Sequence, residues 1–279
     1  FNPSSDFFFY DETNKQLNIS RNKIETFWLR NQSVALELAL SDVIISPTNW
    51  QKEQLPESLK KRCDVIFDGI DNTHIKLNPK ALSKTPLITY GTRGMEPIRA
   101  FPQFIECLPE IIRSNNQIRV EIAGEDKICY GSMSPEEGTW KKWAIELLKR
   151  ENVESNVKWM GYQHGQDYIN WLSSSWCHVY LTHPFVASWS FIEAAYMGIN
   201  MIASDVEPVR EFVHEGSNID LADHRKIEDL IEKIQLKILA PPVQNAKRHN
   251  CLESLSLDGC LKKWLEVLDL GTKTICLTE

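Results

Sequence analysis

The sequence has no apolar run that approaches the length of a membrane-spanning helix, which is about 18 residues. It also has no excess of basic residues, because its formal net charge is -7 at pH 7 and its pI is near 5.6. This balance argues against a general nucleic-acid surface, although it is compatible with a local basic pocket for a diphosphate. We therefore expect a small-molecule partner and no nucleic acid.

Cysteine spacings typical of metal sites are also missing. The seven cysteines are odd in number and scattered, at positions 63, 107, 129, 177, 251, 260 and 276. We interpret them as reduced thiols of a cytoplasmic protein, and we predict no metal site and no cofactor. A Gly-x-Gly-x-x-Gly turn between a strand and a helix is absent too, which argues against a Rossmann dehydrogenase.

The chain starts at Phe1 rather than at methionine, and residues 1–10 lack the basic region and apolar core of a signal peptide. We expect it to be a fragment of a longer protein. Its 279 residues, 42% hydrophobic and 25% charged, have the composition of an ordinary globular protein with room for about two domains.

From Pro86 onward, short apolar runs alternate with helical patterns. The runs have the β-branched and aromatic bias of buried strands, and they lie at 87–90, 118–123, 157–160, 177–182, 201–203 and 219–221. This alternation predicts an α/β fold with a doubly wound parallel sheet. Because ligands bind beyond the carboxyl ends of such strands, we expect Arg93, Gly124, Gly161 and Ser188 to converge on one crevice.

Residues 183–198 have the pattern of a strand end, a tight loop and a helix start. Pro184 stops the preceding strand, and Gly198 is placed to end the helix. If Ser188 or Ser190 caps this helix, its free N–H groups and positive dipole end form an anion site suited to phosphate. An ordinary corner without a ligand is the alternative. In the last helical pattern, 258–268, we expect Asp258 to be the cap.

Several motifs resemble, in the right order, those of family 4 glycosyltransferases. These are retaining, nucleotide-sugar-dependent enzymes of the GT-B fold, which has two Rossmann-like domains. Segments 184–198 and 203–213 resemble the donor-binding region, while 46–51, 67–71, 93–99 and 180–186 resemble a bacterial subgroup. The resemblance covers about residues 40 to 235. Tyr130-Gly131 also matches the subgroup, without a role that the residues themselves suggest.

The resemblance implies three parts. Residues 1–70 are the C-terminal part of an acceptor-side domain, 71–250 are the nucleotide-sugar donor domain, and 251–279 are a C-terminal helix that returns toward the first domain. Most of the acceptor domain is then absent, so we expect the fragment alone to be inactive or weakly active. The missing part would also carry any peripheral association with the inner face of the membrane.

The resemblance implies that Arg93 and Arg99 bind the donor diphosphate, since the family has an Arg and a Lys at about the same spacing in the sequence. Without the family, surface charge is the simpler reading of the two arginines. Backbone N–H groups around Ser188, Trp189 and Ser190 would bind phosphate as well. Gly91 opens the loop that carries Arg93, and it belongs to the expected donor site.

Four further positions complete the expected donor site. Gly161 and Tyr162 lie where the family contacts the nucleobase. His183 is a candidate donor to a phosphate or sugar hydroxyl. Glu193 matches the second of two family glutamates and would hold the ribose diol, with a solvated or self-capping Glu as the alternative. The first family glutamate falls on Phe185, so a mechanism that needs it as nucleophile is unavailable.

We therefore predict a metal-independent glycosyltransferase of polysaccharide biosynthesis. It would move a sugar from a nucleotide-diphosphate sugar to a hydroxyl of a carbohydrate or lipid-linked acceptor, with retention. Arg93, Arg99 and a helix N-terminus would stabilise the leaving diphosphate. The alternative is a nucleotide-sugar or phosphate-ligand binding module without turnover, which Phe185 and the missing acceptor domain favour.

Overall fold

The computed structural model describes residues 21–130, 135–136, 138–242 and 250–275. The chain divides into two compact units, one made of residues 1–74 and 250–279 and the other of residues 75–249. The resemblance predicted a first part that ends at residue 70 and a separate third part made of residues 251–279. Each unit is described below by itself.

The larger unit is built on a six-stranded parallel sheet with the order β5-β4-β3-β6-β7-β8. The strands are β3 (Leu87–Gly94), β4 (Arg119–Glu125), β5 (Val157–Gly161), β6 (Cys177–Tyr180), β7 (Met201–Ser204) and β8 (Ile219–Ala222). All six predicted strands are present, and the doubly wound parallel sheet is confirmed. The strand order reverses between β3 and β6, which is where ligands bind in sheets of this kind.

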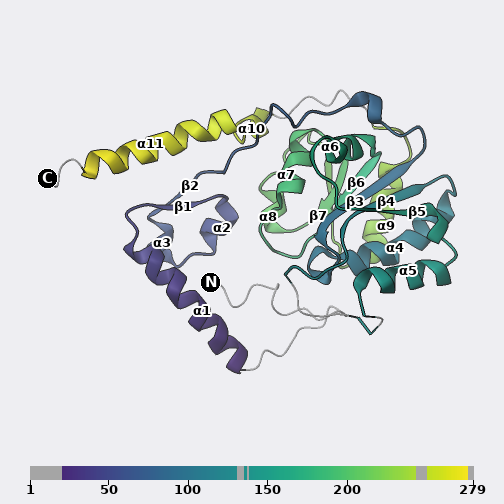
Figure 1. The fold of residues 1–279 in the computed structure, drawn as a ribbon, viewed down its shortest axis with the longest axis horizontal. Coiled ribbons are helices and arrows are strands. Elements are labelled where there is room, and N and C mark those ends of the chain that lie inside the picture. Colours follow the sequence, from purple (N-terminus) through teal and green to yellow (C-terminus); the bar gives the residue numbers. More distant parts are fainter. Residues whose placement is uncertain (1–20, 131–134, 137, 243–249, 276–279) are drawn as a thin grey trace. The chain divides into compact units, whose positions relative to one another are not determined.

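Helices cover both faces of this sheet. They are α4 (Phe101–Ser114), α5 (Trp140–Arg150), α6 (Gly165–Ser174), α7 (Trp189–Tyr196), α8 (Glu207–Arg210) and α9 (Ile227–Lys237). Figure 1 shows α4, α5 and α9 on one face, and α6, α7 and α8 on the other. Short 3-10 helices precede β3 (η2, Pro79–Ala81), α4 (η3, Pro97–Arg99) and β5 (η4, Glu154–Asn156).

The strands are apolar because both faces of the sheet are covered. All four residues of β6 are buried, as are residues 87–90 of β3. Tyr90 stacks on Phe104 of α4 with ring centroids 4.4 Å apart. This packing fixes the start of α4 against the end of β3, where the candidate site lies.

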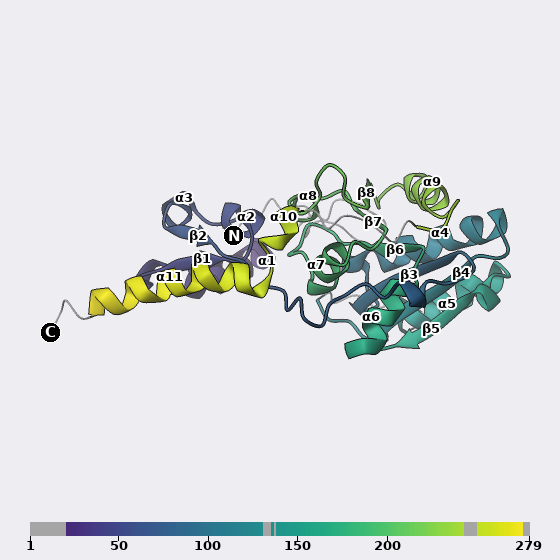
Figure 2. The ribbon, with the colours of Figure 1, turned by 90° about the horizontal axis from the view of Figure 1, so that it is seen from above.

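The smaller unit contains two short parallel strands and several helices. They are α1 (Arg21–Leu40), β1 (Ile44–Ser46), α2 (Asn49–Glu53), α3 (Glu57–Lys60), β2 (Cys63–Val65), α10 (Asn250–Glu253) and α11 (Leu257–Ile275). Ile44, Leu59 and Cys63 form its small core. Figure 2 shows α11 running past the two strands toward the C-terminus.

The prediction that Asp258 caps the last helix is wrong. The helix begins at Leu257, so Asp258 lies inside its first turn. Ser256 does the capping, since its Oγ accepts a hydrogen bond from the Gly259 N–H at 3.2 Å. A backbone hydrogen bond from Leu257 N–H to the Ile70 carbonyl, 2.8 Å long, sets this start. No helix within the described ranges is long and apolar enough to span a bilayer.

Candidate functional site

Arg99 lies at the end of η3 and is buried, with 7% of its surface exposed. Its Nη1 donates to the Tyr180 hydroxyl at 3.1 Å and to Thr182 Oγ1 at 2.9 Å. The Arg99 carbonyl in turn accepts a hydrogen bond of 2.7 Å from the Tyr90 hydroxyl. The residues that fix this arginine therefore come from β3 and from the carboxyl end of β6, at the point where the strand order reverses.

Aromatic rings, not carboxylates, surround the Arg99 guanidinium. Its Cζ lies 5.5 Å from the ring centroid of Tyr130, 6.0 Å from that of Tyr180 and 5.4 Å from that of Phe185. Within the part of the chain that the structure describes, Arg99 forms no ion pair. A buried cation without a counter-charge is costly, so this position is suited to an anionic ligand.

The Tyr180 hydroxyl joins Arg99 to the start of α7. It accepts a hydrogen bond of 3.1 Å from the Ser188 N–H, in addition to the one from Arg99. Ser188 is the N-cap of α7, and its Oγ accepts from the Phe191 N–H at 3.3 Å. The prediction of a serine cap is confirmed at Ser188. Ser190 Oγ lies 2.8 Å from Ser188 Oγ, and Trp189 is 47% exposed.

Tyr130 connects the second arginine to this group. Arg93 is exposed, and a side-chain hydrogen bond with Tyr130 is the largest of the effects that raise the pKa of Arg93. The Tyr130 ring packs against Phe185 with centroids 5.2 Å apart. Fully buried Glu96 holds this loop, because its carboxylate accepts from the Tyr130 N–H at 3.1 Å. The structure thus gathers Arg93, Arg99 and Ser188 through tyrosine side chains.

Glu193 lies on α7 and is partly buried. Burial raises the pKa of its carboxyl group, and a hydrogen bond with the Tyr168 side chain acts in the opposite direction. Tyr168, on α6, is itself partly buried, and its hydroxyl lies 3.5 Å from the Ser190 carbonyl oxygen. A partly desolvated carboxylate of this kind can accept hydrogen bonds from a ligand's hydroxyl groups.

The glycines of the expected site differ in their surroundings. Gly124 has φ +140°, and a Cβ there would overlap the carbonyl oxygen of Thr92. A Cβ on Gly91 would lie 3.1 Å from the Trp171 ring, so this Cα faces packed side chains. Close packing of the chain on itself therefore explains why both positions are glycine. The donor-binding role of the two glycines stays a prediction.

The end of β5 is more open. Gly161 has φ +68°, and no atom lies within 4 Å of the position that a Cβ would take. Tyr162 follows it, 65% exposed, and stacks on His164 with centroids 6.1 Å apart. Open backbone beside an exposed aromatic ring is compatible with the predicted nucleobase contact, which stays a prediction.

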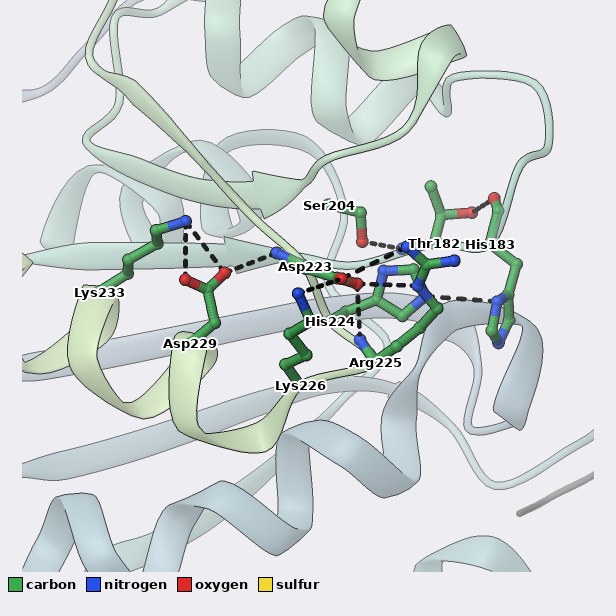
Figure 3. Close-up of polar contacts among 9 residues, drawn as sticks. All are labelled: Thr182, His183, Ser204, Asp223, His224, Arg225, Lys226, Asp229 and Lys233. Carbon is green, nitrogen blue, oxygen red and sulfur yellow. Dashed lines mark hydrogen bonds and ion pairs between the residues drawn. The ribbon is translucent and has the colours of Figure 1, made fainter. Parts of the chain in front are cut away.

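His183 belongs to a polar group beyond β6, β7 and β8 (Figure 3). Thr182 joins this group to Arg99, since its Oγ1 accepts from Arg99 Nη1 and donates to the His183 carbonyl at 2.9 Å. His183 is only 8% exposed, and its Nδ1 lies 3.3 Å from Nε2 of His224. Burial lowers the pKa of His183 to about 4 and that of His224 to about 3, so both rings are neutral at pH 7. Beside them, Asp223 accepts a hydrogen bond of 2.8 Å from Arg225 Nε. His183 therefore offers a neutral ring to a ligand and no positive charge.

Sequence reasoning missed Tyr180, Tyr168, Glu96 and His224. Glu96 lies within the resembled segment 93–99, where a carboxyl group between two arginines is a signal that points to it. Among the described residues, no cluster of three or more His, Cys, Asp or Glu side chains is arranged to hold a metal. Free thiols are present at Cys63, Cys107, Cys129, Cys177 and Cys260.

Comparison of the chain with known proteins gives two family matches. Residues 81–253 match the profile of the family described as glycosyl transferases group 1, and residues 6–75 match the glycosyl transferase family 4 group. A curated relative, the poly(ribitol-phosphate) alpha-N-acetylglucosaminyltransferase of Staphylococcus aureus (strain COL), is 23% identical over 209 residues. The match covers 73% of this chain but 39% of that relative, so the chain spans about two fifths of the relative's length.

Solved structures also resemble the chain. A variant of S. aureus TarM in complex with Fondaparinux, alpha-GlcNAc-glycerol and UDP matches with a TM-score of 0.66 and 19% identity, over 92% of this chain and 48% of that one. Anabaena Alr3699/HepE in complex with UDP and glucose matches with a TM-score of 0.69 and 16% identity, over 90% and 68% of the two chains. Sucrose-phosphate synthase from Thermosynechococcus elongatus matches with a TM-score of 0.71 and 16% identity, over 88% of this chain and 62% of that one. At these identities the likeness concerns the fold.

Proposed function

Because the chain belongs to the glycosyl transferases group 1 family and has the α/β fold class of GT-B glycosyltransferases, we propose that it binds a nucleotide-diphosphate sugar. The whole protein then transfers the sugar to a hydroxyl of a carbohydrate or lipid-linked acceptor, with retention and without a metal ion. The nucleotide sugar is a substrate, and no cofactor takes part. We place the reaction in polysaccharide biosynthesis, on the cytoplasmic side of the membrane.

The buried guanidinium of Arg99 carries this proposal. It is 7% exposed and has no ion pair in the described residues. A diphosphate would supply the missing negative charge and accept strong, charge-assisted hydrogen bonds. The Tyr180 hydroxyl links this guanidinium to the N–H of Ser188, the N-cap of α7, so Arg99 and the start of α7 would act on the same anion.

In the proposed reaction, negative charge develops on the departing diphosphate as the bond to the sugar breaks. Arg93, Arg99 and the N-terminal end of α7 would stabilise that charge, which lowers the barrier because they are in position before the reaction. Phe185 offers no nucleophile beside the sugar. We therefore assign the attack to the acceptor hydroxyl itself. It approaches on the same face of the sugar from which the diphosphate leaves, which gives retention.

The remaining site residues would hold the nucleoside. The Glu193 carboxylate accepts hydrogen bonds from the ribose hydroxyls, with Tyr168 keeping it in place. The nucleobase lies against the open backbone at Gly161 and the ring of Tyr162. UDP is the first nucleotide to test, because two of the similar structures contain it.

A binding module without turnover is the second candidate. Phe185 favours it, because an apolar ring stands where the resembled enzymes have a carboxylate beside the sugar. Such a module would still bind the nucleotide but would leave the sugar bond intact. Mass-spectrometric detection of sugar transferred by the whole protein, rather than by the 279-residue chain alone, therefore separates the two candidates.

Calorimetric titration of Arg99→Ala with UDP and with uridine tests the proposal. The substitution should weaken UDP binding by about 1.5 to 3 kcal/mol, the range for charged hydrogen bonds, and affect uridine far less. Arg150→Ala is the matched control, since Arg150 is an exposed arginine on α5 with 73% of its side chain accessible. Equal loss for UDP and uridine, or no loss for either, contradicts the assignment of Arg99 to the diphosphate.

A further inference from the structure

Tyr130 and Phe185 form a two-ring aromatic surface beside Arg99, which we call the aromatic wall. Their centroids are 5.2 Å apart with planes inclined by 52°. Each ring lies within 5.5 Å of the Arg99 Cζ. Tyr130 is 42% exposed and Phe185 is partly buried, so the wall is accessible beside the guanidinium rather than enclosed in the core.

The position of the wall is fixed by buried contacts. The Glu96 carboxylate, fully buried, accepts hydrogen bonds from the backbone N–H groups of Cys129 and Tyr130, each at 3.1 Å. Ser188, three residues after Phe185, is tied to Tyr180 by its own N–H. The two rings come from loops that follow different strands, and both loops are anchored next to the arginine.

We infer that the aromatic wall binds the sugar of the donor and selects a sugar in which an acetamido group replaces a hydroxyl or a methyl group replaces the hydroxymethyl group. This inference rests on the proposed function, because it takes Arg99 as the diphosphate ligand. The ring centroids lie 5.5 and 5.4 Å from the Arg99 Cζ, so a sugar joined through one oxygen to a phosphate that Arg99 binds would have the two rings beside it.

The chemistry of the wall sets the preference. Aromatic ring faces pack well against methyl and C–H groups. The same faces offer only weak acceptors to a hydroxyl, so a sugar hydroxyl turned toward them loses its hydrogen bonds to water without full replacement. The methyl of a 2-acetamido group or of a 6-deoxy sugar avoids this loss and buries apolar surface. The class of donor is therefore an N-acetylated or deoxygenated sugar nucleotide, rather than a plain hexose nucleotide.

Matched pairs of donors test the preference. Calorimetric Kd values of the 279-residue chain are measured for UDP, for UDP-glucose against UDP-N-acetylglucosamine, and for dTDP-glucose against dTDP-6-deoxyglucose. The methyl-bearing member of at least one pair should bind roughly tenfold more tightly than its hydroxyl-bearing partner. Phe185→Leu removes the ring without placing a charge beside Arg99, so it should reduce this ratio while changing the Kd of the free nucleoside diphosphate less than twofold.

Tyr130→Ala should also reduce the ratio, whereas Tyr130→Phe, which keeps the ring, should preserve it. Melting temperatures of the variants identify any that fail to fold, and Phe185→Met then replaces Phe185→Leu as a milder test that should reduce the ratio. If nucleoside diphosphates bind but the two members of each donor pair have equal affinity, the inference is overturned and the proposed function still stands. Failure of every nucleoside diphosphate to bind overturns both.

Discussion

At the scale of single residues, the site depends on tyrosine hydroxyl groups that bridge charged or polar partners. The Tyr180 hydroxyl accepts from both Arg99 and the Ser188 N–H, and the Tyr90 hydroxyl donates to the carbonyl of Arg99. Such bridges hold a buried guanidinium without neutralising it. Its charge therefore stays available to a ligand, which a carboxylate partner would have prevented.

Glu193→Gln keeps the shape of the side chain and removes its charge. If the carboxylate holds the ribose diol, uridine and UDP should both bind more weakly, by about 1.5 to 3 kcal/mol. A 2′,3′-dideoxy ligand should be insensitive to the change, because it has no hydroxyls to lose. Calorimetry with these three ligands checks the prediction, with Glu146→Gln on the exposed side of α5 as control. Wild-type affinity of Glu193→Gln for UDP would refute the ribose assignment.

Buried His178 should make stability depend on pH. Its Nδ1 lies 2.8 Å from Thr89 Oγ1, and burial lowers its pKa from 6.5 to about 3. Between these values the unfolded chain binds a proton that the folded chain does not, so the free energy of unfolding falls as the pH drops below 6.5. Above pH 6.5 the neutral ring makes its full contribution to the free energy of unfolding.

His178→Gln should therefore flatten the pH dependence of the free energy of unfolding. Urea titrations between about pH 4 and 6 should show a slope smaller by about 1.4 kcal/mol per pH unit, the value for one proton. An unchanged slope in His178→Gln would mean that this ring titrates normally in the folded protein.

At the scale of elements, the close approach of β3 and β4 depends on a residue without a Cβ. Gly124→Ala would bring a methyl group onto the Thr92 carbonyl oxygen, at a φ of +140° that side chains rarely adopt. We expect a loss of at least about 2 kcal/mol in the free energy of unfolding. Gly161→Ala, at φ +68° with open space around it, should cost only about 1 kcal/mol. Urea unfolding of the two variants measures the difference, and equal losses would contradict this account of Gly124.

The elements could be predicted from the sequence because their signals are local. Runs such as 87–90 and 201–203 are apolar throughout, as strands covered on both faces must be, and Ser188 has the short polar side chain that an N-cap requires. The resemblance to a known family named Arg93 and Arg99. The contacts that join these residues could not be predicted, because Arg99 and Tyr180 are 81 positions apart and only the packed fold decides which rotamers meet.

At the scale of the whole molecule, the two units differ in size and in the extent of their sheets. The larger unit has a six-stranded sheet, whereas the described part of the smaller one has a two-stranded sheet. We predict that the 279-residue chain binds a nucleotide sugar yet transfers it slowly or not at all, since an acceptor hydroxyl must be held close to the reacting carbon. Product analysis after incubation with donor and carbohydrate acceptors checks this. Rapid, sustained glycosylation by this chain would show that it contains a complete acceptor site.

The central claim is that protein cations and a helix end bind the diphosphate without a metal ion. Thermal unfolding of the chain with UDP in EDTA, and again with Mg²⁺, tests this most directly. At a UDP concentration about 100 times its Kd, the account predicts a gain of about 2.7 kcal/mol in the free energy of unfolding, equal with and without Mg²⁺. No stabilisation by UDP or by other nucleoside diphosphates under either condition, or stabilisation that appears only with Mg²⁺, would contradict it.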